Sequence, residues 1–597
     1  MNRFGIIFVW ICIYLGGLML TGCAGIGVFP RTSADPADLA ICRAAIFTCN
    51  ASQPEAEALA VKGNRIVYVG SNEGLTDYLG PSTRLINAKG RRITPGFIDN
   101  HCHVLWIGGL TYLMPADLYA CADHAELAAV LKRRAAVDPE LIFIGGIGWK
   151  MENIPGNIPR KELLDAIIPD RPVILMSYSG QCGWLNSMAI HQMESRNPAA
   201  FDELVPVRDG QGHCTGELRH FHAVNFLDFY PFEEMGEKTR EGIMRSMTRA
   251  LDDALALGVT CMNDVQIYRQ FIPFILEFKD KGGLDKARVR CSYYIGHSRL
   301  VDEEQLRADL TEWKLLGSLY SDSHLIFGDS VKLYIDGTPD NRTAFLFEPY
   351  ITDPETVGEP VWTEEEFRHV IQMVDAMGLQ AVTHSIGDAG IHRVINAYEA
   401  VIVADPAKDL RHRVDHCEIP AVDDIGRMGR LGIPAAMQPT HFYGDAMIEE
   451  GFGVDRMQRF MPWRSLEKAG VPVSFGSDWC AGPINPIYGL LISAKRMNYK
   501  GKTDWNKAER IPLANGVRHW TIDSAHALHL EKDLGSIEVG KRADLVMFNE
   551  DPLVIDSIWF LLTHDIELGK LDDFVDLTIV DGKEVYRNPQ TSDFLDE

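Results

Sequence analysis

The stretch PGFIDNHCH, residues 95–103, ends a predicted strand with a histidine on each side of a cysteine. Side chains alternate along a strand, so His101 and His103 share one side and Cys102 faces the other. The stretch lies in Thr94–His103, the first of eight short, β-rich segments. The other seven are Gly258–Val265, Arg288–Ile295, Ser330–Asp336, Leu379–Ile386, Arg411–Glu418, Ile433–Pro439 and Val471–Asp478.

Helical patterns separate most of these strands, for example Glu364–Met377 and Ala389–Ala404. Strands that alternate with helices predict parallel βα units, and eight such units predict a (β/α)8 TIM barrel, an α/β fold. The first connection is the exception, because residues 104–257 are too long for a single crossover helix. We expect part of this segment to be an insertion that covers the mouth of the active site.

Both ends of the chain carry further strand patterns. They are Ala44–Thr48, Glu57–Val61 and Arg65–Val69 near the N-terminus, and Ala543–Phe548 and Leu577–Val580 near the C-terminus. Gly63-Asn64 and Asp581-Gly582 are typical hairpin turns between such strands. We therefore expect one small β-sandwich domain, built from residues 37–93 and 535–597, beside a barrel over residues 94–534.

The N-terminus has the pattern of an export signal. An apolar run over residues 4–20 follows one positive charge and leads into Leu20-Thr21-Gly22-Cys23, which resembles the lipobox of bacterial lipoproteins. We expect a signal peptide over residues 1–22, a lipid on Cys23 and a tether over residues 23–36. An uncleaved membrane anchor is the alternative, although the run is at the short limit for spanning a bilayer. Ala24, in place of Asp, would in a Gram-negative host predict the outer membrane, with the protein facing the periplasm.

Composition excludes some functions. The formal net charge of −25 argues against a nucleic-acid partner, because phosphate binding needs a basic surface. The same charge would be repelled by anionic lipid headgroups, so membrane attachment would have to rely on the lipid anchor. The 12 cysteines show no CxxC spacing, which argues against a cysteine-based zinc site or a thioredoxin-like pair.

Candidate metal ligands fall at the ends of five predicted strands, where barrels place their catalytic groups. They are His101, His103, Lys332, His384, His416 and Asp478. Each alone has an ordinary explanation, as a hydrogen-bonded core histidine, a helix cap or a surface lysine. Together at one end of one barrel they predict a metal centre, because four buried imidazoles need a cation to organise them.

Five motifs in this order resemble the amidohydrolase superfamily, and in particular its amidohydrolase 3 branch, which includes N-substituted formamide deformylases. They are PGFIDNHCH (95–103), VKLYIDG (331–337), THSIGD (383–388), RHRVDH (411–416) and FGSDW (475–479). NRTA (341–344) with the Pro349-Tyr350 beyond it, QPTH (438–441) and GSIEVGKRADL (535–545) resemble further segments of the branch. The resemblance covers residues from about 37 to about 590.

The resemblance implies a binuclear centre of two divalent metal ions, with a preference for zinc. Lys332 would be carboxylated by carbon dioxide and bridge the two ions. His101 and His103 would bind one ion together with Asp478, and His384 and His416 would bind the other. A carbamate also fits the electrostatics, since an ammonium beside two dications would be repelled. Metal-bound hydroxide would attack a carbonyl, and Asp478 would pass the proton to a leaving nitrogen.

Five residues are candidates for contact with the substrate: Trp149, Gln181, Arg342, Gln438 and His441. Gln181 lies in residues 180–187, in a segment where the branch usually has a histidine at that position. Glutamine can form hydrogen bonds but cannot carry a proton, so either the specificity has changed or the loop is simply variable.

The expected reaction is hydrolysis of a carbon–nitrogen bond, and specifically an amide, in a small molecule. Hydrolysis of an ester or lactone at the same centre is an alternative within enzymes. A surface lipoprotein that binds a solute without catalysis is the alternative outside them. A mononuclear deaminase would leave Lys332 without a role. The sequence leaves the substrate, the disulfides and the oligomeric state open, and a homo-oligomer is compatible with it.

Overall fold

The computed structural model describes residues 35–590, apart from 114–115, 138–142, 179–181, 220–228, 230–235, 297–302, 341, 443–445, 498–505 and 555–572. The predicted signal peptide, Cys23 and Gln181 lie outside these residues. Within the described part of the chain, no helix combines the length and the apolar character needed to cross a membrane.

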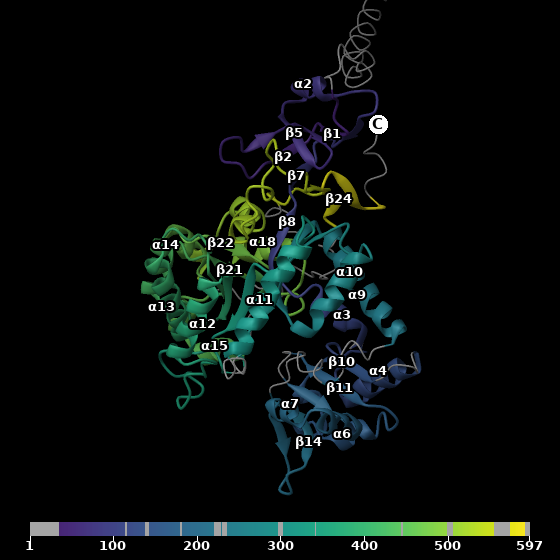
Figure 1. Cartoon of the computed structure of the whole chain (residues 1–597), viewed down its shortest axis with the longest axis vertical. Coiled ribbons are helices and arrows are strands. Elements are labelled where there is room, and N and C mark those ends of the chain that lie inside the picture. Colours follow the sequence, from purple (N-terminus) through teal and green to yellow (C-terminus); the bar gives the residue numbers. More distant parts are fainter. Residues whose placement is uncertain are drawn as a thin grey trace, which may run out of the picture.

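Eight parallel strands form the barrel, which confirms the predicted fold (Figure 1). In chain order they are β8 (Phe97–Cys102), β15 (Val259–Ile267), β16 (Arg288–Tyr294), β18 (Ser330–Tyr334), β19 (Gln380–Ser385), β20 (Arg413–His416), β21 (Ala435–Met437) and β22 (Val473–Phe475). Each pairs with the next, and the short β17 (Leu325–Ile326) adds to β16. Beyond the last ladder, the Asp478 amide donates to the His101 carbonyl at 2.7 Å, which ties the end of the sheet back to its beginning.

The predicted first strand, Thr94–His103, is two strands in the structure. β7 (Arg92–Pro95) pairs with strands of the small domain, and β8 pairs with β15 in the barrel. Gly96 separates them, and a Cβ there would lie 2.1 Å from the Thr260 hydroxyl oxygen. Only glycine allows the chain to pass so close to the neighbouring strand as it changes sheets. One apolar run in the sequence therefore serves two cores.

The barrel helices begin and end at recognisable signals. They include α10 (Ile272–Asp280), α11 (Glu303–Tyr320), α12 (Glu364–Ala376), α13 (Asp388–Ala404), α14 (Val422–Leu431), α17 (Trp463–Lys468), α18 (Pro486–Lys495), α19 (Leu513–His519) and α20 (Ile522–Ala527). Thr363 and Glu366 form a reciprocal capping box that starts α12. Gly432, with φ of 65°, ends α14 and turns the chain into β21.

The small domain combines strands from both ends of the chain. One sheet has the order β5-β4-β1-β6, and the other has the order β25-β24-β23-β7-β2-β3. Their bounds are β1 (Leu39–Cys42), β2 (Ala45–Phe47), β3 (Glu55–Ala56), β4 (Ala58–Lys62), β5 (Arg65–Gly70), β6 (Arg84–Asn87), β23 (Leu545–Phe548), β24 (Val575–Val580) and β25 (Lys583–Arg587). Ile41 and Leu59 of the first sheet and Leu545 and Ile579 of the second share one buried apolar cluster.

A separate sheet forms after β8, within the segment predicted to contain an insertion. Its order is β13-β14-β12-β11-β10-β9. Its strands are β9 (Ala116–Asp117), β10 (Ile144–Trp149), β11 (Val173–Ser177), β12 (Gly183–Leu185), β13 (Pro206–Arg208) and β14 (Cys214–Leu218), with α4 (His124–Val137), α6 (Ser187–Arg196) and α7 (Pro198–Glu203) beside them. Figure 1 shows this unit at the end of the barrel away from the small domain. The long α9 (Glu237–Ala256) returns the chain to β15.

A buried ionic cluster joins the barrel to the small domain. Arg288, the first residue of β16, lies 2.6 Å from an Asp544 oxygen and 2.5 Å from an Asp581 oxygen. His324 and Arg542 also contact Asp581, at 3.3 and 2.8 Å. Burial would raise the pKa of Asp581, but these cationic neighbours outweigh it and hold that pKa below its usual value.

We expect Asp581→Asn to destabilise the protein at pH 7 by about 3 kcal/mol, the lower end of the range for breaking a buried pair. Because the folded pKa is depressed, the stabilisation is present above the unfolded pKa of about 3.9 and is lost as the pH falls below it. Thermal melting of both proteins along an acid series measures this. Asp202→Asn, which breaks an exposed pair with Arg208, is the control. A stability difference that did not narrow in acid would contradict the prediction.

Candidate metal centre

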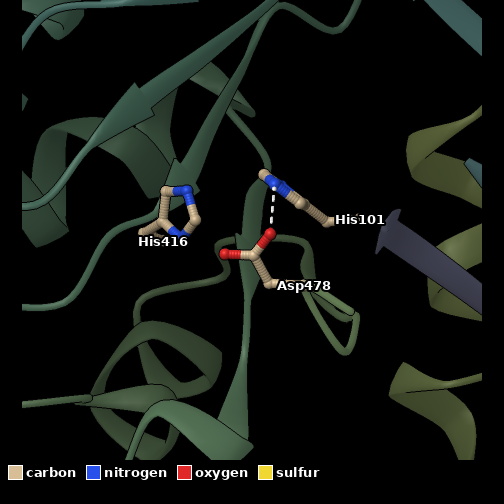
Figure 2. A group of neighbouring side chains, drawn as sticks. All are labelled: His101, His416 and Asp478. Carbon is tan, nitrogen blue, oxygen red and sulfur yellow. Dashed lines mark ion pairs between the residues drawn. The ribbon is translucent and has the colours of Figure 1, made fainter. Parts of the chain in front are cut away.

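Three candidate ligands meet where β8, β20 and β22 end, as Figure 2 shows for His101, His416 and Asp478. Asp478 Oδ1 lies 3.3 Å from His101 Nε2 and 3.0 Å from His103 Nε2. Cys102 lies between the two histidines in sequence, but its Sγ contacts the Asn263 carbonyl oxygen on the neighbouring strand. The alternation expected along residues 101–103 thus directs both imidazoles to one carboxylate oxygen.

The four imidazoles form a continuous row. Ring centroids are 5.7 Å apart for His103 and His101, 4.7 Å for His101 and His416, and 4.3 Å for His416 and His384. His384 stacks on Tyr334 at 4.7 Å on its other side. The row crosses the barrel from β8 to β19, so residues distant in the sequence become neighbours only through closure of the sheet.

An unusual backbone conformation orients two of the candidate ligands, His416 at the end of β20 and Asp478 after β22. His416 and the following Cys417 have φ of 71° and 48°, and Asp478 has φ of 52°. Non-glycine residues in this region cost on the order of 1–3 kcal/mol each. At His416 the change breaks the strand alternation, which allows His416 and Asp415, its neighbour in sequence, both to reach the centre of the barrel.

The donor set fits a divalent cation. His101, His416 and Asp478 are buried, and one ligand atom from each lies within 4.8 Å of the others. Buried His103 Nδ1 and His416 Nδ1 have no hydrogen-bond partner among the described residues. Buried polar atoms without a partner are costly, and a bound cation organises such a cluster. Imidazole and carboxylate are also the ligands that zinc uses in catalytic sites.

The pKa values of His384, His416 and Asp478 favour the protonation states that bind a cation. Burial lowers the pKa of His384 to about 3, with Lys332 adding to the effect, and burial lowers the pKa of His416 as well. Burial alone would raise the pKa of Asp478, but His101, His103 and His441 hold it well below its usual value. His384 and His416 are therefore neutral and the Asp478 carboxylate is ionised, as metal ligands must be.

Lys332 is fully buried beside the row of imidazoles. Its Nζ lies 3.5 Å from Asp415 Oδ2 and 5.0 Å from the centre of the Tyr334 ring. Burial lowers the pKa of Lys332 to about 8, although the negative charge of Asp415 opposes this. The lowered pKa increases the fraction of neutral amine near physiological pH, and the neutral amine is the form that can react with carbon dioxide.

Sequence reasoning missed two carboxylates of the site. Asp415 Oδ2 lies 2.6 Å from His101 Nδ1, and Arg413 Nε lies 2.8 Å from Asp415 Oδ1. Such an outer carboxylate fixes the tautomer and orientation of a ligand histidine. Glu418 Oε1 lies 3.2 Å from His441 Nδ1. Their positions, one before and two after His416, are the only signal for them in the sequence.

The described candidates for substrate contact lie in different surroundings. His441 lies at the centre, with Nε2 3.3 Å from Asp478 Oδ2. Gln438, after β21, is buried, and its Oε1 has no hydrogen-bond partner among the described residues. Arg342 forms an ion pair with Asp353 in the loop after β18. Trp149 packs on Trp184 in the core of the inserted sheet.

The chain matches one protein-family model and several curated proteins over most of its length. The model of a family described as the amidohydrolase family matches residues 84–586. The chain is 29% identical over 565 residues to the Arabidopsis thaliana protein LONG AFTER FAR-RED 3, with 92% of each chain covered. It is 24% identical over 522 residues to an N-substituted formamide deformylase of Arthrobacter pascens, with 86% of this chain and 94% of that protein covered.

A solved structure shares the fold. The crystal structure of an uncharacterised metal-dependent hydrolase from Pyrococcus horikoshii OT3 aligns with a TM-score of 0.71 and 22% sequence identity. The alignment covers 86% of this chain and 98% of that one. At this identity the match supports the architecture alone.

Proposed function

This chain belongs to the amidohydrolase family, and on that premise we propose that it hydrolyses an amide bond of a small molecule at a centre of two zinc ions. Family membership makes the chain a metal-dependent hydrolase of carbon–nitrogen bonds other than peptide bonds. The proposal of a metal centre rests on the convergence of His101, His103 and His416 around one ionised, buried Asp478.

The proposed ligands divide into two groups around Lys332. His101, His103 and Asp478 would hold one ion, and His384 and His416 the other. A carboxylated Lys332 would bridge them, which its burial and its lowered pKa support. When bound, such ions acidify water and polarise a carbonyl.

Asp478 performs the proton transfers in this proposal. It accepts a proton from the attacking water and delivers it to the nitrogen that leaves as an amine. Asp415 Oδ2 lies 2.6 Å from His101 Nδ1, and this contact would keep Nε2 facing the centre. The relative that deformylates N-substituted formamides makes N-formyl compounds the first substrates to test.

The test of the function is turnover of a panel by the soluble, zinc-loaded protein. The panel contains N-formyl compounds, N-acyl compounds and dipeptides, with esters and lactones beside them, and metal content is measured on the same preparation. We expect about two ions per chain and hydrolysis of N-formyl or N-acyl compounds. Turnover of esters alone would replace the amide assignment, and a metal-free protein with full activity would refute the centre.

We expect the carbamate on Lys332 to form during reconstitution with metal. Apoprotein reconstituted with zinc and ¹³C-bicarbonate should show a carbamate carbon signal and regain more activity than protein reconstituted without bicarbonate. Lys332→Ala should lack the signal and lose at least one ion, since it removes the bridging ligand. Lys408→Ala, which removes an exposed lysine paired with Asp375, is the control. A wild-type protein that regains full activity without bicarbonate and shows no signal would contradict the bridge.

We further propose that the protein is exported and anchored by a lipid on Cys23, on the evidence of residues 4–23. Cys23→Ser should remove the lipid and shift the protein from the membrane fraction to the soluble or the uncleaved form. Fractionation with mass spectrometry of the N-terminus measures this. Cys42→Ser is the control, because Cys42 is a buried residue of β1. Wild-type protein that retains residue 1 and carries no lipid would refute the proposal.

A further inference from the structure

We propose that His441, held by Glu418, is a positioning residue that fixes the orientation of the Asp478 carboxylate. This rests on the proposed function of Asp478 and replaces the expectation that His441 contacts the substrate. His441 Nε2 lies 3.3 Å from Asp478 Oδ2, and Nδ1 lies 3.2 Å from Glu418 Oε1. All three side chains are buried, at 7% exposure for His441, 8% for Asp478 and 3% for Glu418.

The two oxygens of Asp478 have different neighbours. Oδ1 faces His101 Nε2 and His103 Nε2, whereas Oδ2 faces His441 alone among the ion pairs of the described residues. Contacts to both oxygens fix the rotation of a carboxylate about its last side-chain bond, and a contact to one oxygen does not. His441 is thus the group that keeps Oδ1 directed at the two ligand histidines.

Backbone contacts hold both Glu418 and His441 in place. The Glu418 carbonyl oxygen accepts from the Met461 amide at 2.6 Å. His441 lies in a short 3-10 turn, Pro439–His441, and its amide donates to the Gln438 carbonyl at 2.9 Å. Phe442, the next residue, packs under the Arg496 guanidinium at 4.6 Å. One ring nitrogen of His441 faces each carboxylate, so Glu418 and Asp478 together hold the ring in one orientation.

Two substitutions at position 441 separate positioning from mere packing. His441→Asn places an amide near the former Nδ1, so it keeps the contact with Glu418 and loses the one with Asp478. His441→Gln places an amide near the former Nε2 and can still donate to Asp478. We expect His441→Asn to lower kcat by about 10- to 100-fold, the scale of outer-shell changes at metal sites, with KM and zinc content unchanged. His441→Gln should recover part of the loss, and Glu418→Gln should show a smaller loss of the same kind.

His519 provides a matched control. It is also a buried imidazole between two carboxylates, 2.8 Å from Glu467 and 2.9 Å from Asp523, but these belong to helices outside the centre. His519→Gln should lower the melting temperature and leave kcat unchanged.

A second readout does not depend on turnover. In the cobalt-loaded protein, visible absorption reports ligand geometry, and His441→Asn should shift these bands whereas His519→Gln should not. If the wild type hydrolysed no amide, the proposed function would fail while the spectrum still tested the position of Asp478. Unchanged bands and kcat in His441→Asn would overturn the inference. Loss of an ion would make His441 a ligand, and a raised KM with normal kcat would make it a substrate contact; either result would also overturn it.

Discussion

His101→Ala is expected to deplete the bound metal and to lower kcat/KM by at least about 10²-fold, since even outer-shell changes at metal sites cost 10- to 100-fold. The reason lies in the number of contacts that His101 makes. Its Nε2 faces Asp478 and its Nδ1 faces Asp415, so the variant loses a ligand and leaves two buried carboxylates without their shared partner. Zinc content and turnover, measured on one preparation, provide the test.

The control for this variant is a histidine with a similar contact at the surface. His369 Nε2 lies 3.0 Å from Glu303 Oε2, and the His369 side chain is 48% exposed. His369→Ala should keep both metal and activity. His384→Ala should behave as His101→Ala does, because His384 belongs to the same row of imidazoles. Full activity in both His101→Ala and His384→Ala would refute the metal centre.

Asp478→Asn is expected to fold, to keep much of its metal and to lose about 10²-fold or more in kcat, the usual scale for a general acid–base group. Asparagine keeps the shape of the side chain and one oxygen acceptor, but it cannot accept the proton of water. An amine leaves poorly as an anion, so the missing proton transfer should dominate the loss. The measurement is kcat on an amide, with metal content determined on the same sample.

Asp388→Asn controls for the removal of a buried carboxylate near the barrel mouth. Asp388 begins α13 and contacts Arg459 at 3.1 Å, so its loss should affect stability more than chemistry. An Asp478→Asn variant with both ions and near-normal kcat would remove Asp478 from the proton transfer. His441 would then position a carboxylate that takes no part in the proton transfer, although its effect on ligand geometry would still be measurable.

Much of the fold followed from local pattern. The capping box at Thr363 and Glu366 and the hairpin at Gly63-Asn64 are decided within a few residues, so these elements could be predicted where they occur. The split at Gly96 could not, because Thr94–His103 reads as a single strand-like pattern in the sequence. What divides them is which sheet each half joins, and that depends on β2, β15 and β23.

The ligand candidates and the barrel could be predicted from the sequence alone, because strand alternation and a strand's carboxyl end are local properties that His101-Cys102-His103 already display. The partners of those residues depend on the three-dimensional structure. Asp415 reaches His101, and Glu418 reaches Asp478 through His441, because β20, β21 and β22 are neighbours in the closed sheet and His416 leaves the strand alternation with positive φ. Hydrogen bonds between strands join residues far apart in the chain, and no local pattern encodes which carboxylate a given imidazole will meet.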